Sequence, residues 1–233
     1  MTRQLLSSGF EVLTAMNKEW SELNKTMQVQ LKKADTFKNG ICTLFELRNS
    51  MMQDILSFRE LGKELFSAMP FMNANGYHSK SIAYSLWHIF RIEDIVSHTL
   101  INDDEQIFFS GNYKERINSP IITTGNELVR EQISDFSKRL DIDELYAYIS
   151  DVKLSTEKIL GTLAFDVLKK KISADQKEKL ISLNVVSSNE NAEWLINYWC
   201  GKDVRGLICM PLSRHWIMHT EASLRIRNKL TPA

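Results

Sequence analysis

Residues 82–96 read IAYSLWHIFRIEDIV, and this stretch decides the fold that the sequence predicts. It lies in a block from about 79 to 101 that is apolar over most of its helical circumference. A helix of that kind is expected to be buried on more than one side. One polar line at helical spacing crosses the block and is expected to face solvent; its members are Lys80, Tyr84, Arg91, Asp94 and His98.

The blocks around this stretch also repeat every three or four residues. Two precede it, at about 10–37 and 42–68, and Asn39-Gly40 is predicted to end the first of them. Breaks at Pro70 and Asn75-Gly76 follow the second. After the central stretch, a connection over about 102–123 has no sustained period, and connections of that length often cover a site.

Capping signals divide the remainder of the chain into further helices. Thr124-Gly125-Asn126-Glu127 predicts the start of a short helix, and a longer one is expected from Asp141 or Asp143. Ser173-x-x-Gln176 and Ser187-x-x-Glu190 predict two more short helices. The last block spans about 203–229, where Pro211 either kinks the helix or begins its second segment.

No block alternates at period two, so the predicted fold class is all-α. Four long helices are expected to pack as an up-down four-helix bundle, with an extra amino-terminal helix and short connecting helices. The expected division is an amino-terminal helical extension over 1–40, packed on the bundle or on a partner, and the bundle itself over 41–233.

Composition narrows the classes of function. The 233 residues carry 29 Lys+Arg and 29 Asp+Glu, and no basic patch stands out, so nucleic acid is not an expected partner. No export signal and no apolar run of membrane-spanning length is present, so we expect a cytoplasmic protein without a membrane partner. The three cysteines lack C-x-x-C spacing, which argues against a disulfide framework and a cysteine-based zinc site.

His215 and His219 are candidate metal ligands. At i and i+4 they lie roughly 40° apart around a helix and about 6 Å apart along it, so one ion could contact both. Both fall on the apolar stripe of the last block, where unpartnered imidazoles would be costly to bury. The alternative is a pair of core histidines, each hydrogen-bonded to a carbonyl or a carboxylate.

His88 is the candidate third ligand, because it lies on an apolar face of the central stretch. His98 lies on the polar line roughly 15 Å further along the axis, and His78 lies in a loop beside Gly76. E-x-x-H, H-E-x-x-H, the nucleotide-binding glycine loops and G-x-S-x-G are all absent from the sequence.

Ser85-Leu86-Trp87-His88-Ile89 and the terminal His215-x-x-x-His219-x-Glu221 together resemble the DinB/YfiT-like superfamily of metal-binding four-helix bundles. Those proteins have one His on the second bundle helix and an H-x-x-x-H pair on the fourth. The resemblance covers roughly residues 42–230, and the helix over 10–37 lies outside it. Thr220 precedes Glu221 where many members carry Gly.

The resemblance implies a divalent metal held by His88, His215 and His219. Imidazole ligands suit zinc or nickel best, with manganese or iron as alternatives. It implies two reaction types on a small-molecule substrate: hydrolysis by activated water, and transfer using a low-molecular-weight thiol such as bacillithiol or mycothiol. The sequence does not choose between them.

Several neighbours are weaker candidates for the site. Glu93 and Asp94 could orient a ligand imidazole, although Asp94 shares the polar line. Glu221 points about 200° away from His219, which favours a packing role over a general base. Tyr84 and Trp199 could line a substrate pocket, and Arg205 and Arg214 could hold a substrate carboxylate, with core packing and surface ion pairs as the respective alternatives.

A noncatalytic binding protein, with a structural or vestigial metal site or none, is the rival hypothesis. In that case the amphipathic helix over 10–37 would dock a partner or a second copy of the chain. Its apolar stripe includes Trp20 and would be exposed unless something covers it. This stripe predicts a homodimer.

Overall fold

The computed structural model describes residues 2–71 and 80–231, so Asn75-Gly76 and His78 lie outside the described residues. The regular secondary structure of the described residues is helical and includes no strand, as the sequence predicts. No helix within it is long and apolar enough to cross a membrane. Its α-helices are α1 (Thr2–Gln30), α2 (Phe37–Ser57), α3 (Lys63–Ser67), α4 (Ile82–Asp94), α5 (Ile107–Ser110), α6 (Tyr113–Arg116), α7 (Glu131–Arg139), α8 (Ile142–Thr162), α9 (Ala174–Ser182), α10 (Glu190–Cys200), α11 (Val204–Cys209) and α12 (His215–Leu230).

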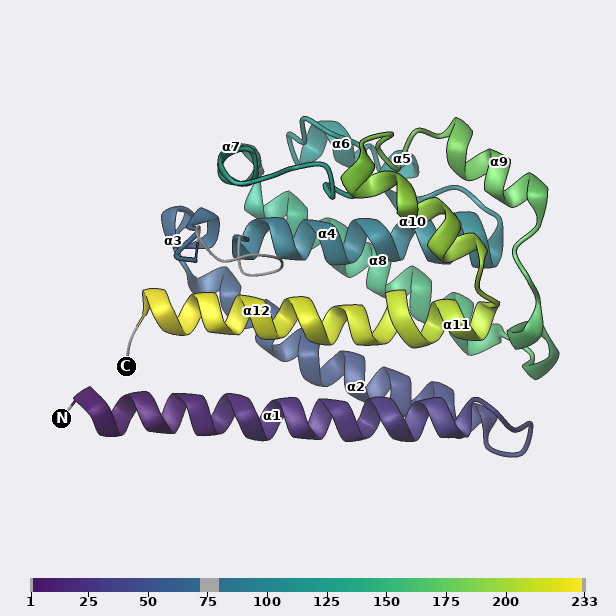
Figure 1. Ribbon diagram of the computed structural model, residues 1–233, viewed down its shortest axis with the longest axis horizontal. Helices are drawn as coiled ribbons and strands as arrows, with labels where there is room; N and C mark the ends of the chain where they lie inside the picture. Colours follow the sequence, from purple (N-terminus) through teal and green to yellow (C-terminus); the bar gives the residue numbers. More distant parts are fainter. Residues whose placement is uncertain (1, 72–79, 232–233) are drawn as a thin grey trace.

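Four long helices, α2, α4, α8 and α12, pack around the core (Figure 1). Helices α2 and α8 run in opposite directions, because Ile55 contacts Tyr146 and Arg48 contacts Glu157. Helices α4 and α8 run in the same direction: Asp94 accepts a hydrogen bond from Tyr148, and Ser97 one from Thr156.

Helix directions therefore do not alternate along the chain, as an up-down arrangement with short loops requires. The long connection over 103–141 carries the chain back to the end at which α4 began, and α8 then repeats the direction of α4. Helix α12 runs against α4 and alongside α2, as Figure 1 shows. A crossover of this kind is one of the two standard ways to connect four packed helices.

Helix α1 packs along α2 and also contacts α12. Trp20, Met27 and Leu31 are buried, and the Trp20 indole N–H donates to Ser50 Oγ at 3.0 Å. The stripe that motivated a homodimer is thus covered within one chain. Homodimerisation stays a prediction, and light scattering would test it.

The first helix was predicted to end at Asn39-Gly40, but the turn lies at residues 31–36 and Gly40 is inside α2. Glycine is used here for close approach rather than for a left-handed turn. A Cβ at Gly40 would lie 2.9 Å from Leu31 Cδ2 and 3.1 Å from the Leu31 backbone nitrogen. The prediction that Asn39-Gly40 ends the first helix is therefore wrong.

The polar line of α4 does not face solvent. Tyr84, Arg91, Asp94 and His98 are all buried, the last on a π-helical continuation of α4 over Ile95–Asn102. The connection after α4 covers this face and supplies its polar partners, for example the Ile122 carbonyl, which accepts from Arg91 Nε at 2.8 Å.

Capping signals had mixed outcomes. Ser173 and Gln176 form the predicted capping box of α9. Helix α10 begins at Glu190, but its cap is Asn189 rather than Ser187. No helix starts at Thr124; α7 begins at Glu131 instead, and the Thr124 segment forms a turn over α4.

Candidate metal centre and cleft

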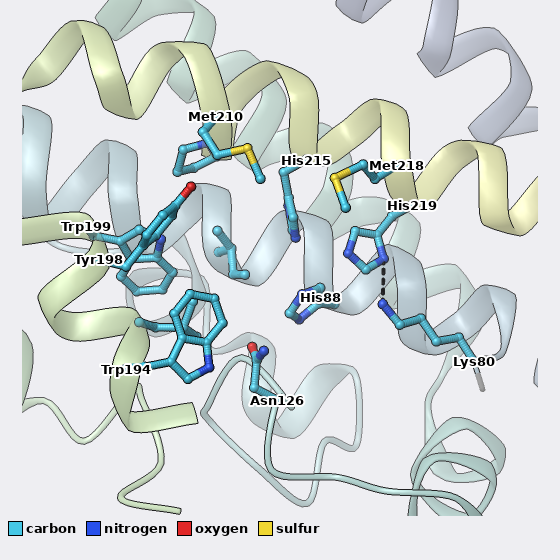
Figure 2. Close-up of a pocket in the computed structure, with 13 residues that line it drawn as sticks. Lys80, His88, Asn126, Trp194, Tyr198, Trp199, Met210, His215, Met218 and His219 are labelled. Atoms are coloured by element: carbon cyan, nitrogen blue, oxygen red, sulfur yellow. Dashed lines mark hydrogen bonds between the residues drawn. The ribbon is translucent and has the colours of Figure 1, made fainter. Parts of the chain in front are cut away.

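Three imidazoles from α4 and α12 converge in the core of the protein. The ring centroid of His88 lies 4.9 Å from that of His215 and 4.7 Å from that of His219, and the centroids of the two α12 rings are 4.5 Å apart. One potential ligand atom from each ring lies within 4.8 Å of the other two. All three residues are buried, and they point toward one another in Figure 2.

A buried ion pair fixes the register of the helices that carry these rings. Arg48 of α2 donates to the Glu93 carboxylate at 2.6 and 2.9 Å and to the Leu212 carbonyl at 3.2 Å. The Trp216 indole N–H donates to the same carboxylate at 2.7 Å. Because Glu93 lies on α4 and Trp216 follows His215, this network holds α12 against α4 where the imidazoles meet.

The last block changes its winding immediately before the ligand pair. Residues Met210–Arg214 form a π-helical turn between α11 and α12, and His215 is the first residue of α12. Turns of this type contain one extra residue per turn and occur often at functional sites. Pro211 lies in this turn, so its effect is a change of winding rather than a simple kink or a new start.

All three imidazoles are neutral at physiological pH. Burial and, to a smaller extent, the positive charge of Lys80 together lower the pKa of His88 to about 3. Burial also holds the pKa values of His215 and His219 well below the ordinary value for histidine. Neutral imidazole is the form that binds metal ions.

Hydrogen bonds leave ring nitrogens available within the cluster. His88 Nδ1–H donates to the Thr124 carbonyl at 2.8 Å, which orients the ring and leaves Nε2 free. His215 Nδ1 is buried without a hydrogen-bond partner. His219 Nδ1 lies 3.5 Å from the Lys80 ammonium. A buried ring nitrogen without a partner is costly unless a ligand supplies one.

These residues fit a metal ion in chemistry and in spacing. Nitrogen atoms that share one tetrahedral zinc ion lie about 3.3 Å apart, because each zinc–nitrogen bond is about 2.0–2.1 Å. The ligand atoms here lie within 4.8 Å of one another, so modest side-chain rotations bring them to that spacing. Orientation of His88 by a backbone carbonyl is the usual partner arrangement for a metal-binding histidine.

A cleft of about 300 Å³ opens onto the three imidazoles. Figure 2 shows aromatic side chains on one side of it and the imidazoles with Lys80 on the other. Burial lowers the pKa of Lys80 to about 8, so the ammonium form predominates at pH 7. None of the described residues that line the cleft is acidic; they are Lys80, His88, Ile92, Asn126, Trp194, Leu195, Tyr198, Trp199, Met210, Pro211, His215, Met218 and His219.

The weaker candidates from the sequence lie in different places. Trp199 lines the cleft. Tyr84 does not, but its ring stacks on His88 with centroids 5.6 Å apart, and its hydroxyl donates to the Gly125 carbonyl. Arg214 is exposed and lies outside the lining.

The carboxylates that were considered as neighbours have other partners. Glu93 is bound by Arg48 and Trp216, so it acts on the helices rather than on an imidazole. Asp94, expected to be solvated, is buried at the other end of α4. Glu221 pairs with Arg225 on the same helix at 2.5 Å. Arg205 lies 3.8 Å from Asp203, which is a surface ion pair.

Sequence reasoning missed two features of the site. Lys80 was placed on a solvent-facing line, although it lies four and eight residues before Tyr84 and His88 and so shares a helical face with them. Thr124 and Asn126 were assigned to a helix start, whereas their turn supplies the His88 acceptor and part of the cleft lining. No local pattern identifies a backbone carbonyl as a partner of a distant ring.

The chain matches no protein-family model, no curated protein and no solved structure. The family resemblance therefore rests on the short histidine motif and the order of the helices.

Proposed function

We propose that this protein is a metal-dependent enzyme of the DinB/YfiT-like type, in which His88, His215 and His219 hold one divalent cation. The observation that carries the proposal is the convergence of three neutral, buried imidazoles within 4.8 Å of one another at the end of an open cleft. Zinc or nickel suits three imidazole ligands best.

The arrangement of helices supports the resemblance. Among the four long packed helices, the second in chain order, α4, carries His88, and the fourth, α12, carries the spaced pair. This is the distribution that the DinB/YfiT-like resemblance implies. Access from a cleft also favours a catalytic site over a structural one, because structural metal sites are closed by protein ligands.

A divalent ion bound here would supply Lewis acidity, which lowers the pKa of a coordinated water toward about 7 and deprotonates a coordinated thiol. The chain itself orients His88 through Thr124 and places a cation, Lys80, beside His219. No carboxylate lines the cleft among the described residues. The site is therefore compatible with both reaction types, since neither a metal-bound water with a pKa near 7 nor a metal-bound thiol needs an acidic residue as its base.

The rival hypothesis of a noncatalytic docking protein has less support. It depended on an apolar stripe of α1 that a partner would cover, and that stripe packs on α2 within the chain. A cleft beside the imidazoles is better explained by a small-molecule substrate than by a docking surface.

Elemental analysis of protein purified without chelator tests the proposal. We expect about one equivalent of zinc or nickel, lost in the single variants His88→Ala, His215→Ala and His219→Ala, because three ligands are needed for tight binding. His98→Ala is the matched control, since His98 is also buried on the same helical rod and hydrogen-bonds Asp104 instead. Thiol consumption with an electrophile should follow the metal content across this series.

Absence of metal from the wild-type protein, even after incubation with zinc and nickel, would overturn the proposal. Equal metal loss in His98→Ala would also contradict it, because the effect would then reflect general destabilisation.

A further inference from the structure

One wall of the cleft is aromatic and comes from a single helix. Trp194, Tyr198 and Trp199 of α10 line it together. The Trp194 and Tyr198 rings pack edge to face with centroids 5.5 Å apart, and the Trp194 indole N–H donates to the Asn191 carbonyl at 3.0 Å. Trp194 is nevertheless 49% exposed. Its ring is thus held in place while about half of the side chain stays accessible, which leaves surface on which a flat ligand can stack.

The opposite side of the cleft is cationic. The Lys80 ammonium approaches His219 Nδ1 and lies 6.0 Å from the centre of the Tyr84 ring, and no carboxylate pairs with it among the described residues. With three neutral imidazoles and no acidic lining residue, the only formal charge in the described lining is positive. A partly buried cation without a counter-ion is stabilised when a ligand supplies one.

The size of the cleft limits what can occupy it. Its volume is about 300 Å³. An apolar cavity of about 150 Å³ holds one benzene molecule. The cleft therefore has room for one ring or a small fused ring together with a compact charged group.

We propose that the cleft binds a small organic anion with a flat apolar body, whose charged group lies between Lys80 and the three imidazoles and whose body stacks on Trp194 and Tyr198. This inference deepens the proposed function, since it names the class of substrate for the same site. The anionic end would reach the centre that is proposed to hold the metal, so the ligand is oriented by charge at one end and by stacking at the other.

Binding of benzoate, benzamide and acetate to metal-free wild-type protein provides the first test. Benzoate has both features, benzamide has the ring without the charge, and acetate has the charge without the ring. By calorimetry and tryptophan fluorescence, we expect benzoate to bind about tenfold to a hundredfold more tightly than benzamide, the range for a hydrogen bond to a charged group. Acetate should bind more weakly than benzoate as well.

Variants assign the effect to residues. Lys80→Met keeps the length of the side chain and should reduce benzoate affinity to that of benzamide. Lys229→Met is the matched control, because Lys229 is exposed on α12 and does not line the cleft. Trp194→Ala should weaken benzoate and benzamide alike, whereas Trp194→Phe should retain binding of both.

The outcomes separate this inference from the metal proposal. If metal binds but benzoate shows no advantage over benzamide and acetate, the inference is overturned and the metal centre stands. If no metal binds but benzoate binds through Lys80 and Trp194, the ligand class stands and the metal centre falls. Equal benzoate binding by Lys80→Met and wild type would also overturn the inference.

Discussion

The two ends of α4 are equally buried, and they satisfy their polar side chains in different ways. At the carboxyl-terminal end, Asp94 accepts hydrogen bonds from the backbone N–H groups of Ile107 and Phe108 and from the Tyr148 hydroxyl, each at 2.9 Å. Arg91 lies beside the same carboxylate and donates to Gln106. This core end fastens the long connection to the helix.

The cleft end, by which we mean α4 from its first residue to His88 at its middle, has the opposite character. His88 is surrounded by two other imidazoles and by the Lys80 side of the cleft, with no carboxylate in the described lining. His98, at the core end, lies 2.6 Å from one oxygen of Asp104 and 4.0 Å from one of Asp94. Burial of a histidine therefore does not distinguish a site from a structural network. The features that distinguish the candidate site from a structural network are its access to a cleft and its lack of an acidic partner.

Acidification should produce the largest effect, because it acts on all three imidazoles of the cleft end. Their folded-state pKa values lie below that of an unfolded histidine, so the unfolded chain binds more protons at mildly acid pH. Stability is then fully present above about pH 6.5 and falls as the pH drops toward 3. For His88, whose folded-state pKa is about 3, the loss of stability between pH 7 and pH 5 should reach about 2 kcal/mol in metal-free protein, and the other two imidazoles act in the same direction.

Urea unfolding at a series of pH values measures this dependence. Replacement of all three cleft histidines by Gln should flatten the curve between pH 5 and pH 7, whereas His98→Gln should leave most of the slope. An unchanged slope in the triple variant would place the acid sensitivity elsewhere in the molecule.

A single substitution at the core end should destabilise the protein more than one at the cleft end. Asp94→Ala leaves Arg91 buried beside unpaired backbone donors and should destabilise the protein by about 3–5 kcal/mol. His215→Ala removes a ring nitrogen that has no partner and should change stability by less than about 1 kcal/mol in metal-free protein. Chemical denaturation of both variants at pH 7.5 compares them, and equal losses would contradict the distinction between the two ends.

Added zinc should stabilise the cleft end alone. A ligand that binds only the folded state at 100 times its dissociation constant raises the free energy of unfolding by about 2.7 kcal/mol. We expect this increase in wild type and in His98→Ala, and none in His219→Ala. Melting temperature measured with and without zinc is sufficient, and stabilisation of His219→Ala would show that zinc binds at another place.

The smallest effect is expected from the turn that orients His88. Gly125 has φ +80°, and a Cβ there would lie 3.1 Å from the Tyr84 ring. Gly125→Ala should cost about 1–2 kcal/mol of stability, the penalty for a left-handed residue with a Cβ. Zinc affinity should fall about tenfold, as for loss of an orienting partner of a ligand. Gly62→Ala is the control, since nothing lies within 4 Å of its Cβ position and its φ is −60°.

The sequence predicts the helical class and the histidine cluster because both depend on local periodicity. His215 and His219 share a face through spacing alone, and the apolar surroundings of His88 mark a buried helix. That His88 meets the other two imidazoles was a prediction about packing, because 127 residues separate His88 from His215 in the chain. The structure brings the three rings together.

Other features depended on contacts that no local pattern encodes. The polar line of α4 has the same spacing as a solvated face, and only the connection that covers Asp94 and Arg91 makes it internal. The predicted alternation of helix directions was wrong for a related reason: alternation follows from short connections, and the connection over 103–141 is long and includes α5, α6 and α7. Glu93 was identified as a residue near the site, but its partner Arg48 lies on another helix and gives it a different role.

The π-helical turn at Met210–Arg214 makes the histidine pair sensitive to chain length. Successive residues of an α-helix are rotated by about 100°, and this turn holds one residue more than regular winding would. Deleting one codon there would restore regular winding and force either α11 or α12 to rotate. The imidazoles would then face away from His88, or the buried face of α11 would leave the core. A single in-frame insertion or deletion could thus create or erase the centre in evolution while every ligand residue remained in the gene.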